Sequence, residues 1–434
     1  MKAARLLLLG ILIYLLSVFG LILLNAGLLA LIVPLLVFLA PAILYGPGEP
    51  QLELARDLDV DRASPDTPIT VTLTVTNKGE RLELLRLRDN LPPGLTIVDG
   101  EWELLTPLEA GETVELSYRV RGRRGRYNFG PVHIWVSDLF GLLQREVVRE
   151  APGHFEFHIF PDVLKVDRLP IRPRQTKVYA GYIPAHVGGS GVEFFNVRHY
   201  QPGDALRHLN WRANARHPDT FFTNEFEQER VADVGVILDA RQSLYVDLGG
   251  QSLFEPAVSA AAALSDSFLS DGNRVALLRY GDFLDWTVPG YGKLQRERIL
   301  RALARAQLGD SLVFDQLENL PTRLFPAKSQ LVLVSPLTWE DVDPLHRLRA
   351  RGYHLLVVSP DPVTFEVSRL EGDGTLSMAT RVARIERLLL FRKLRQAGIQ
   401  VMNWDVSVPF DQGIRDFAAQ LRPVVERNLG AMMP

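Results

Sequence analysis

The chain has 434 residues, of which 47% are hydrophobic and 23% are charged, and its formal net charge is -3. This length suggests two or three domains, and the near balance of charge argues against a dedicated nucleic-acid-binding protein, which usually carries a basic excess. We therefore expect no nucleic acid among its partners. The sequence contains no cysteine, which excludes disulfides, thiolate metal sites and cysteine nucleophiles.

Two apolar runs open the sequence. The first extends from Leu6 to Leu24, about one bilayer thickness of helix, and the second from Leu28 to Tyr45. A cleavable signal peptide is the alternative, but no convincing small-residue cleavage site precedes the second run. We therefore predict a transmembrane helical hairpin over residues 1–49, which would hold the protein in the lipid bilayer.

The basic residues near the N-terminus predict the orientation of this hairpin. Lys2 and Arg5 precede the first span, and positive charge favours the cytoplasmic side. Two spans return the chain to the side on which it began. The prediction is a multi-pass protein of the cell membrane whose remaining domains are cytoplasmic.

Residues 50–160 have the pattern of an antiparallel β-sandwich. The segment Ile69–Asn77, ITVTLTVTN, alternates apolar and polar residues with a period of two, as a half-buried strand does. Asn77-Lys78-Gly79 then supplies a turn. Further short strands between Pro and Gly signals predict a sandwich of about a hundred residues.

From residue 233 onward, apolar runs alternate with helical stretches. The runs are 233–239, 274–280, 330–336, 354–360 and 400–406, and the helices include 254–270 and 381–398. Strands that alternate with helices favour a parallel sheet covered on both faces. We predict an α/β, Rossmann-like domain over residues 233–434, with any ligand site at the carboxyl ends of its strands.

Residues 161–232 form a connecting region that contains the densest polar stretch of the chain. Pro202 and Gly203 predict a turn in which Asp204 hydrogen-bonds the backbone, and the spacing of Arg207 and Trp211 predicts one helical face. Arginine and carboxylate at this density predict a bidentate network that joins sandwich to sheet and presents part of a partner surface. The candidate residues of this stretch are Glu193, Arg198, Tyr200, Gly203, Asp204, Arg207, Trp211 and Arg216, with Glu225 and Glu227 as further carboxylates.

A catalytic role for the same stretch is the alternative. Such a role needs a base or a nucleophile with a tuned pKa, and only His199 and Asp204 are obvious candidates. We assign no catalytic residue.

The end of the strand 233–239 carries a possible metal site. Asp239, Arg241 and Ser243 resemble the Asp-x-Ser-x-Ser motif of von Willebrand factor A domains, in which a carboxylate and hydroxyls hold Mg²⁺. Here Arg241 replaces the middle ligand, and its positive charge would repel a divalent cation. We expect no cofactor, with a degenerate Mg²⁺ site at Asp239 and Ser243 as the alternative.

The stretch GVEFFNVRHYQPGDALRHLNWRANAR, residues 191–216, resembles the signature of the domain-of-unknown-function-58 family. The matching positions are Gly191, Glu193, Phe194, Arg198, Tyr200, Pro202, Gly203, Asp204, Arg207, Trp211, Ala215 and Arg216. The resemblance implies a von Willebrand A-like domain behind a β-sandwich, anchored in the membrane. It also implies association with MoxR-type AAA+ ATPases.

These observations together predict a membrane-anchored scaffold or adaptor that works with a MoxR-type AAA+ ATPase in protein assembly or maturation. Two alternatives remain: a metal-dependent, adhesion-type protein-binding module, and a membrane-proximal hydrolase. The oligomeric state, the cargo and the biological process are left open by the sequence.

Overall fold

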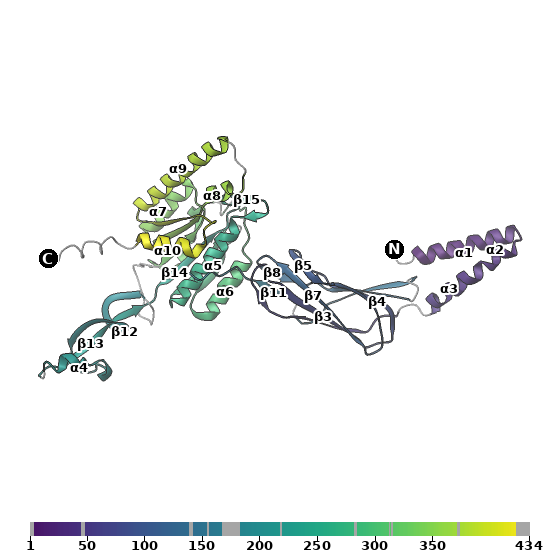
Figure 1. Cartoon of the computed structure of the whole chain (residues 1–434), viewed down its shortest axis with the longest axis horizontal. Coiled ribbons are helices and arrows are strands. Elements are labelled where there is room, and N and C mark those ends of the chain that lie inside the picture. The colour runs from purple at the N-terminus through teal and green to yellow at the C-terminus, as the bar shows by residue number, and fades with distance from the viewer. Residues whose placement is uncertain are drawn as a thin grey trace. The chain divides into compact units, whose positions relative to one another are not determined.

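The structure, a computed structural model, describes residues 4–44, 48–138, 142–153, 156–166, 183–217, 219–281, 284–311, 313, 316–370 and 374–421. Contacts divide the chain into two units, Met1–Phe160 and Pro161–Pro434. Figure 1 shows the elements of both units along the chain.

The N-terminal apolar sequence forms three helices: α1 (Ala4–Ile22), α2 (Ala26–Ala30) and α3 (Ile32–Leu44). Asn25 accepts hydrogen bonds from the backbone N–H groups of Gly27 and Leu28 and so begins α2. The second apolar run is therefore divided, and α3 is only about 20 Å long at about 1.5 Å per residue.

The prediction of two transmembrane helices is wrong. Among the described residues, no helix combines the length and the apolarity that crossing a membrane requires. The hydrocarbon core is about 30 Å thick and needs about 20 consecutive apolar helical residues, whereas α1 has 19 residues and α3 has 13. The predictions of a lipid anchor and of a multi-pass membrane location with cytoplasmic domains depended on those spans. They are therefore wrong as well.

Two four-stranded antiparallel sheets form the body of the first unit. One has the order β1-β3-β7-β5 and the other β10-β9-β4-β6. Their bounds are β1 (Leu52–Leu58), β3 (Ile69–Asn77), β4 (Leu82–Arg88), β5 (Leu95–Gly100), β6 (Glu103–Leu108), β7 (Thr113–Gly122), β9 (Val132–Ser137) and β10 (Gln144–Arg149). A small third sheet contains β2 (Arg62–Ala63), β8 (Gly125–Asn128) and β11 (Glu156–Ile159).

Strict alternation explains the core between the two large sheets. Along β3 every second residue, from Ile69 to Val75, is fully buried, and the threonines between them face outward. At the end of β3 the buried Asn77 side chain donates to the carbonyls of Glu80, Leu108 and Glu109 and accepts from Gly79 N–H. The predicted turn after Asn77 is thus fixed by its own amide.

A buried ion pair crosses this core. Arg56 on β1 donates to both carboxylate oxygens of Asp89, at 3.2 and 2.5 Å, and to the carbonyl of Gly130 at 3.0 Å. The Tyr118 hydroxyl donates to the same carboxylate at 2.7 Å, and the guanidinium stacks over the ring of Phe129. Every charge of the pair is therefore matched inside the sandwich.

The second unit begins with a long antiparallel ribbon made of β12 (Ile183–His199) and β13 (Phe222–Arg230). The segment between these strands contains the single turn η1 (Leu206–His208) and the short helix α4 (Trp211–Asn214). The prediction that Arg207 and Trp211 share one helical face is wrong, because extended backbone at Leu209 separates the two turns. We call residues 198–225 the ribbon tip.

The rest of the second unit is an α/β fold around a sheet of order β18-β17-β14-β19-β20-β21. Neighbouring strands from β17 to β21 pair in parallel, and β18 pairs with β17 antiparallel at one edge. The bounds are β14 (Asp233–Asp239), β17 (Arg274–Tyr280), β18 (Asp285–Gly290), β19 (Gln330–Val334), β20 (His354–Pro360) and β21 (Gln400–Trp404). Strands 233–239, 274–280 and 354–360 therefore lie where the apolar runs predicted them.

Helices cover both faces of this sheet, as the uninterrupted apolar strands require. Helix α5 (Phe254–Ser270) contacts β14 and β17, and Ile237 of β14 belongs instead to the core shared with α7 and α9. The other helices are α6 (Gly292–Ala304), α7 (Val342–Ala350), α8 (Pro362–Val367), α9 (Gly374–Gln396) and α10 (Phe410–Leu421). Between β14 and β19 the strand order reverses, and the crevice at this switch point is where such sheets bind ligands.

The Arg56–Asp89 pair yields a stability prediction for the sandwich. Arg56→Ala would leave the Asp89 carboxylate buried without its cation, which should lower the free energy of unfolding of this unit by about 3–5 kcal/mol. Hydrogen exchange localised to peptides of β1, β3 and β7 measures that loss. Arg86→Ala, which removes a half-exposed partner of Glu103, should change the same free energy by less than about 1 kcal/mol. Equal effects of the two substitutions would contradict the assignment.

Candidate functional site

The ribbon tip is organised around Arg198. Its guanidinium makes a two-pronged contact with Asp204, at 2.9 and 2.8 Å, and lies 3.4 Å from the Glu225 carboxylate. Asp204 also accepts from the backbone N–H of Gln201 at 2.8 Å, across the predicted turn, in which Gly203 has a φ of 111°. A positive φ favours glycine at that position.

This contact fixes the charge of Asp204. The hydrogen bond from Arg198 is the main cause that lowers the pKa of the Asp204 carboxyl below its ordinary value, with help from Gln201 N–H. A carboxylate held ionised by a bidentate arginine is a weak proton acceptor. Within the described residues no hydrogen bond joins the His199 side chain to Asp204, and the His199 ring packs against Phe222 at 4.9 Å.

Polar and aromatic contacts hold the rest of the tip. The Asn210 side chain caps α4 by accepting from Ala213 N–H, and its amide donates to Asn224 at 2.8 Å. Asn214 accepts from the N–H of Phe222 at 2.6 Å, and Tyr200 N–H donates to Phe221 carbonyl. Sequence reasoning missed both asparagines, although Asn210 stands at a helix start, where Asn is a recognised cap signal.

The outer surface of the tip combines apolar and basic side chains. Leu206 is 70% exposed, Trp211 is 70% exposed and Phe221 is 61% exposed. Arg207, Arg212 and Arg216 are exposed beside them, and no ion pair is recorded for these three within the described residues. We call these six residues the tip surface.

The sequence predicted a network of arginines and carboxylates joining the sandwich to the sheet. In the described residues the paired members are Arg198, Asp204 and Glu225, and all three belong to the ribbon tip. The side chains of Glu193 and Glu227 lie outside the described part of the structure. Network and tip surface are therefore two different sets of residues.

A second polar cluster lies at the switch point of the sheet. Asp239, at the end of β14, is fully buried and accepts from Arg241 at 2.7 Å and from the Ser335 hydroxyl at 2.7 Å. The same guanidinium donates to Asp341 at 2.9 Å. Asp341 in turn accepts from Thr338 N–H and hydroxyl and so caps the turn η5 (Trp339–Asp341).

The Arg241 guanidinium occupies the position between carboxylates that a divalent cation would need. Burial alone would lower its pKa, but the hydrogen bonds and charges of Asp239 and Asp341 raise the pKa of Arg241 well above its ordinary value. Ser243, the other predicted ligand, is exposed on the turn η2 (Gln242–Leu244). Because a permanent cation already satisfies both carboxylates, the residues present do not fit Mg²⁺.

A third buried arginine cluster continues along the same edge of the sheet. Arg387 of α9 donates to Pro336 carbonyl at 2.8 Å, to Ser359 hydroxyl at 2.9 Å and to Asn403 at 2.9 Å. Burial lowers the pKa of Arg387 to about 10, against the charge of Asp361, so it remains charged at neutral pH. The loop after β19 is thus held from both sides, by Arg241 through Asp239 and Ser335 and by Arg387 through Pro336.

The sequence contains local signals for two of these partners. Asp341 stands three residues after Thr338, the spacing of a capping box. Arg387 precedes Leu390, Phe391 and Leu394 at helical spacing, so it lies on the core face of α9. A charge at such a position requires buried acceptors.

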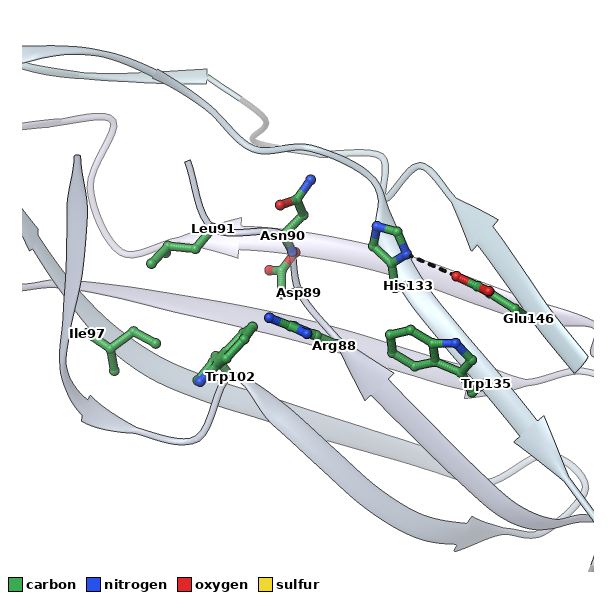
Figure 2. Close-up of a pocket in the computed structure, with 9 residues that line it drawn as sticks. All are labelled: Arg88, Asp89, Asn90, Leu91, Ile97, Trp102, His133, Trp135 and Glu146. Carbon is green, nitrogen blue, oxygen red and sulfur yellow. Dashed lines mark hydrogen bonds and ion pairs between the residues drawn. The ribbon is translucent and has the colours of Figure 1, made fainter. Parts of the chain in front are cut away.

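A groove of about 510 Å³ lies on the sandwich (Figure 2). The Arg88 guanidinium stacks over the Trp102 ring at 4.2 Å, and the His133 and Trp135 rings stack at 5.7 Å. His133 Nδ1 lies 3.6 Å from Glu146, and Asp89 is held by Arg56. The polar side chains that line the groove therefore pair with one another or with Arg56. Within the described residues they form no nucleophile–base pair.

Comparison with known proteins adds a family match to this geometry. The model of the family described as protein of unknown function DUF58 matches residues 196–362. That range contains the paired residues of the ribbon tip, Arg198, Asp204 and Glu225. It also contains Asp239, Arg241 and Asp341. The DUF58 match therefore spans the Arg198 cluster and the Arg241 cluster, whereas Arg387 lies beyond it.

Relatives extend the similarity beyond the DUF58 match. The uncharacterized protein YeaD of Bacillus subtilis is 26% identical over 357 residues, which cover 81% of this chain and 82% of that protein. The uncharacterized protein Rv1480 of Mycobacterium tuberculosis is 27% identical over 229 residues, 50% of this chain and 69% of its own.

Solved structures resemble only parts of the chain. A FixG-related protein from Vibrio parahaemolyticus has a TM-score of 0.16 and 14% identity, covering 26% of this chain and 98% of that protein. A β-glucosidase from Listeria innocua has a TM-score of 0.13 and 14% identity, covering 25% of this chain and 17% of the enzyme. Scores this low carry no argument about fold or function.

The Arg241 cluster yields a prediction with a pH dependence. Arg241→Ala should lower the free energy of unfolding of the α/β unit by about 3–5 kcal/mol, because two buried carboxylates lose their cation. Burial already raises the pKa of Asp341 above its ordinary value, opposed by the charge of Arg241. Without Arg241 the folded state would bind a proton more readily than the unfolded state, so stability should rise as pH falls.

Urea unfolding at pH 7.5 and pH 5 measures this effect, with a smaller loss expected at pH 5. The matched control is Arg301→Ala, which removes a surface pair with Glu297 and should cost less than about 1 kcal/mol at either pH. A loss for Arg241→Ala that stays constant or grows toward pH 5 would contradict the assignment.

Proposed function

We propose that this protein is an adaptor or scaffold that docks a protein partner on the tip surface. The observation that carries the proposal is the exposure of Leu206, Trp211 and Phe221 beside three arginines on a segment braced by its own hydrogen bonds. Tryptophan and arginine are the residue types that dominate binding energy at protein interfaces. A braced surface also loses little conformational entropy on binding.

We propose further that the partner is a MoxR-type AAA+ ATPase and that the pair acts in protein assembly or maturation. The support is the resemblance of residues 191–216 to the family signature and the DUF58 match over 196–362. A von Willebrand A-like character for the α/β unit belongs to the same proposal. Its support is the parallel sheet with one antiparallel edge strand and the polar cluster at its switch point.

The two alternative functions have less support from the geometry. A metal-dependent adhesion module would need an ion where the Arg241 guanidinium lies between Asp239 and Asp341. A hydrolase acting through Asp204 and His199 would need a free base, and Arg198 holds Asp204 as an ionised partner. Protein docking on the tip surface, in contrast, requires neither a bound metal ion nor a free base.

The test is a pull-down of the tagged full-length protein, with and without ATP, followed by mass spectrometry. We expect an AAA+ ATPase to be recovered in a nucleotide-dependent way. Trp211→Ala should weaken that recovery by at least about 30-fold, the cost of an interface hot spot. It should leave the free energy of unfolding within about 0.5 kcal/mol, because the side chain is exposed.

The matched control is Trp339→Ala, which removes a second exposed tryptophan, 47% exposed, from the carboxyl edge of the sheet. It should leave recovery of the partner unchanged. Loss of binding in this variant alone would transfer the docking surface from the tip to the sheet edge. A preparation without any ATPase would contradict the proposed partner.

A further inference from the structure

Helix α9 has two apolar faces, whereas a surface helix of a globular domain normally has one. The first face packs on the sheet through the buried side chains of Leu390, Phe391 and Leu394. Figure 1 shows α9 as a long helix on the outside of the α/β unit. The second face carries Met378, Val382, Ile385, Leu388 and Leu389, which are 73, 53, 57, 64 and 49% exposed.

The exposed face has the spacing of a coiled-coil seam. Met378, Val382, Ile385 and Leu389 follow one another at intervals of four, three and four residues, which are the d, a, d and a positions of two heptads. In the same register Arg387, Leu390 and Phe391 take positions f, b and c. The heptad therefore assigns the packed residues to the face opposite the seam, as the burial of these residues requires.

The charges beside the seam identify its occupant. Arg381 takes position g and Glu386 takes position e, both are exposed, and no ion pair is recorded for either in the described residues. In a parallel two-stranded coiled coil, a residue at g faces the residue five positions further along the other helix, at e. Arg381 of one copy would thus face Glu386 of a second copy, and twofold symmetry would form this pair twice.

An antiparallel arrangement lacks this complementarity. There, position g faces g and position e faces e, so Arg381 would lie near Leu388 and Glu386 near Ala379. We propose that two copies of this chain associate through parallel α9 helices, with Met378, Val382, Ile385 and Leu389 as the seam. The seam is about 18 Å long, so the dimer is concentration-dependent rather than permanent.

The sharpest test exchanges charges between copies of the full-length chain. Arg381→Glu alone places a second carboxylate against Glu386, and Glu386→Arg alone places two guanidinium groups together, so each variant should dimerise at least about 10-fold more weakly than wild type. A mixture of the two variants restores an opposite-charge arrangement across the seam. Sedimentation equilibrium should therefore show weak self-association of each variant and strong association of the mixture.

A second test replaces the seam itself. Ile385→Glu should weaken dimerisation by at least about 30-fold, because it places a charge in the centre of the apolar seam. Val288→Glu is the matched control, since Val288 is 65% exposed on β18 and lies outside α9. This control should leave the mass distribution unchanged.

The absence of cysteine from the sequence makes the orientation measurable. In Met378→Cys the introduced thiol meets its own copy across a parallel seam, and mild oxidation should give a disulfide-linked dimer. An antiparallel seam would instead link Met378→Cys to Leu389→Cys in a mixture, and would overturn the parallel register. A wild-type chain that stays at 48.7 kDa at every concentration, or forms trimers, would overturn the dimer.

These outcomes are independent of the proposed adaptor role. Loss of the dimer in Ile385→Glu with unchanged ATPase recovery would leave the tip surface in place. Loss of recovery in Trp211→Ala with an intact dimer would leave the α9 seam in place.

Discussion

The carboxyl edge of the α/β sheet depends on one requirement: a carboxylate buried at Asp239 needs a cation beside it. Arg241 supplies that cation from two residues away and shares it with Asp341. Through Ser335 the same carboxylate fixes the loop after β19, and Arg387 fixes that loop from its other side. Leu337 within it keeps a φ of 62°, a strained conformation for leucine that persists only where its surroundings enforce it.

The surfaces that we propose for docking consist of residues other than those of this edge. In sheets of this order, the switch point is the usual place for a ligand, but here its polar groups are satisfied by their own chain. The ribbon tip and the outer face of α9 are two places in the second unit where several exposed apolar side chains lie close together in the sequence. Both surfaces display side chains that a partner can desolvate without breaking the internal network.

Local patterns in the sequence predicted the regular elements well. Strand β3 was predicted to the residue because its alternation is unbroken, and the predicted strand 233–239 and helix 254–270 coincide with β14 and α5. The contacts of Arg387 depend on residues between 16 and 51 positions away, which no local pattern encodes. The predicted membrane hairpin was wrong because apolarity alone did not reveal the division of the second apolar run at α2. The predicted helical face shared by Arg207 and Trp211 was wrong because spacing alone did not reveal the extended backbone at Leu209.

The cation between Asp239 and Asp341 is the side chain of Arg241, so it is covalently part of the protein and cannot dissociate. A metal held between two carboxylates exchanges with solvent, so its occupancy follows the concentration of the free ion, and removing the ion is a way to change the state of the site. A guanidinium carried on the same chain has no free concentration, and no chelator competes for it. The cation between Asp239 and Asp341 is therefore present whenever the chain is folded, whatever the concentration of free metal ions.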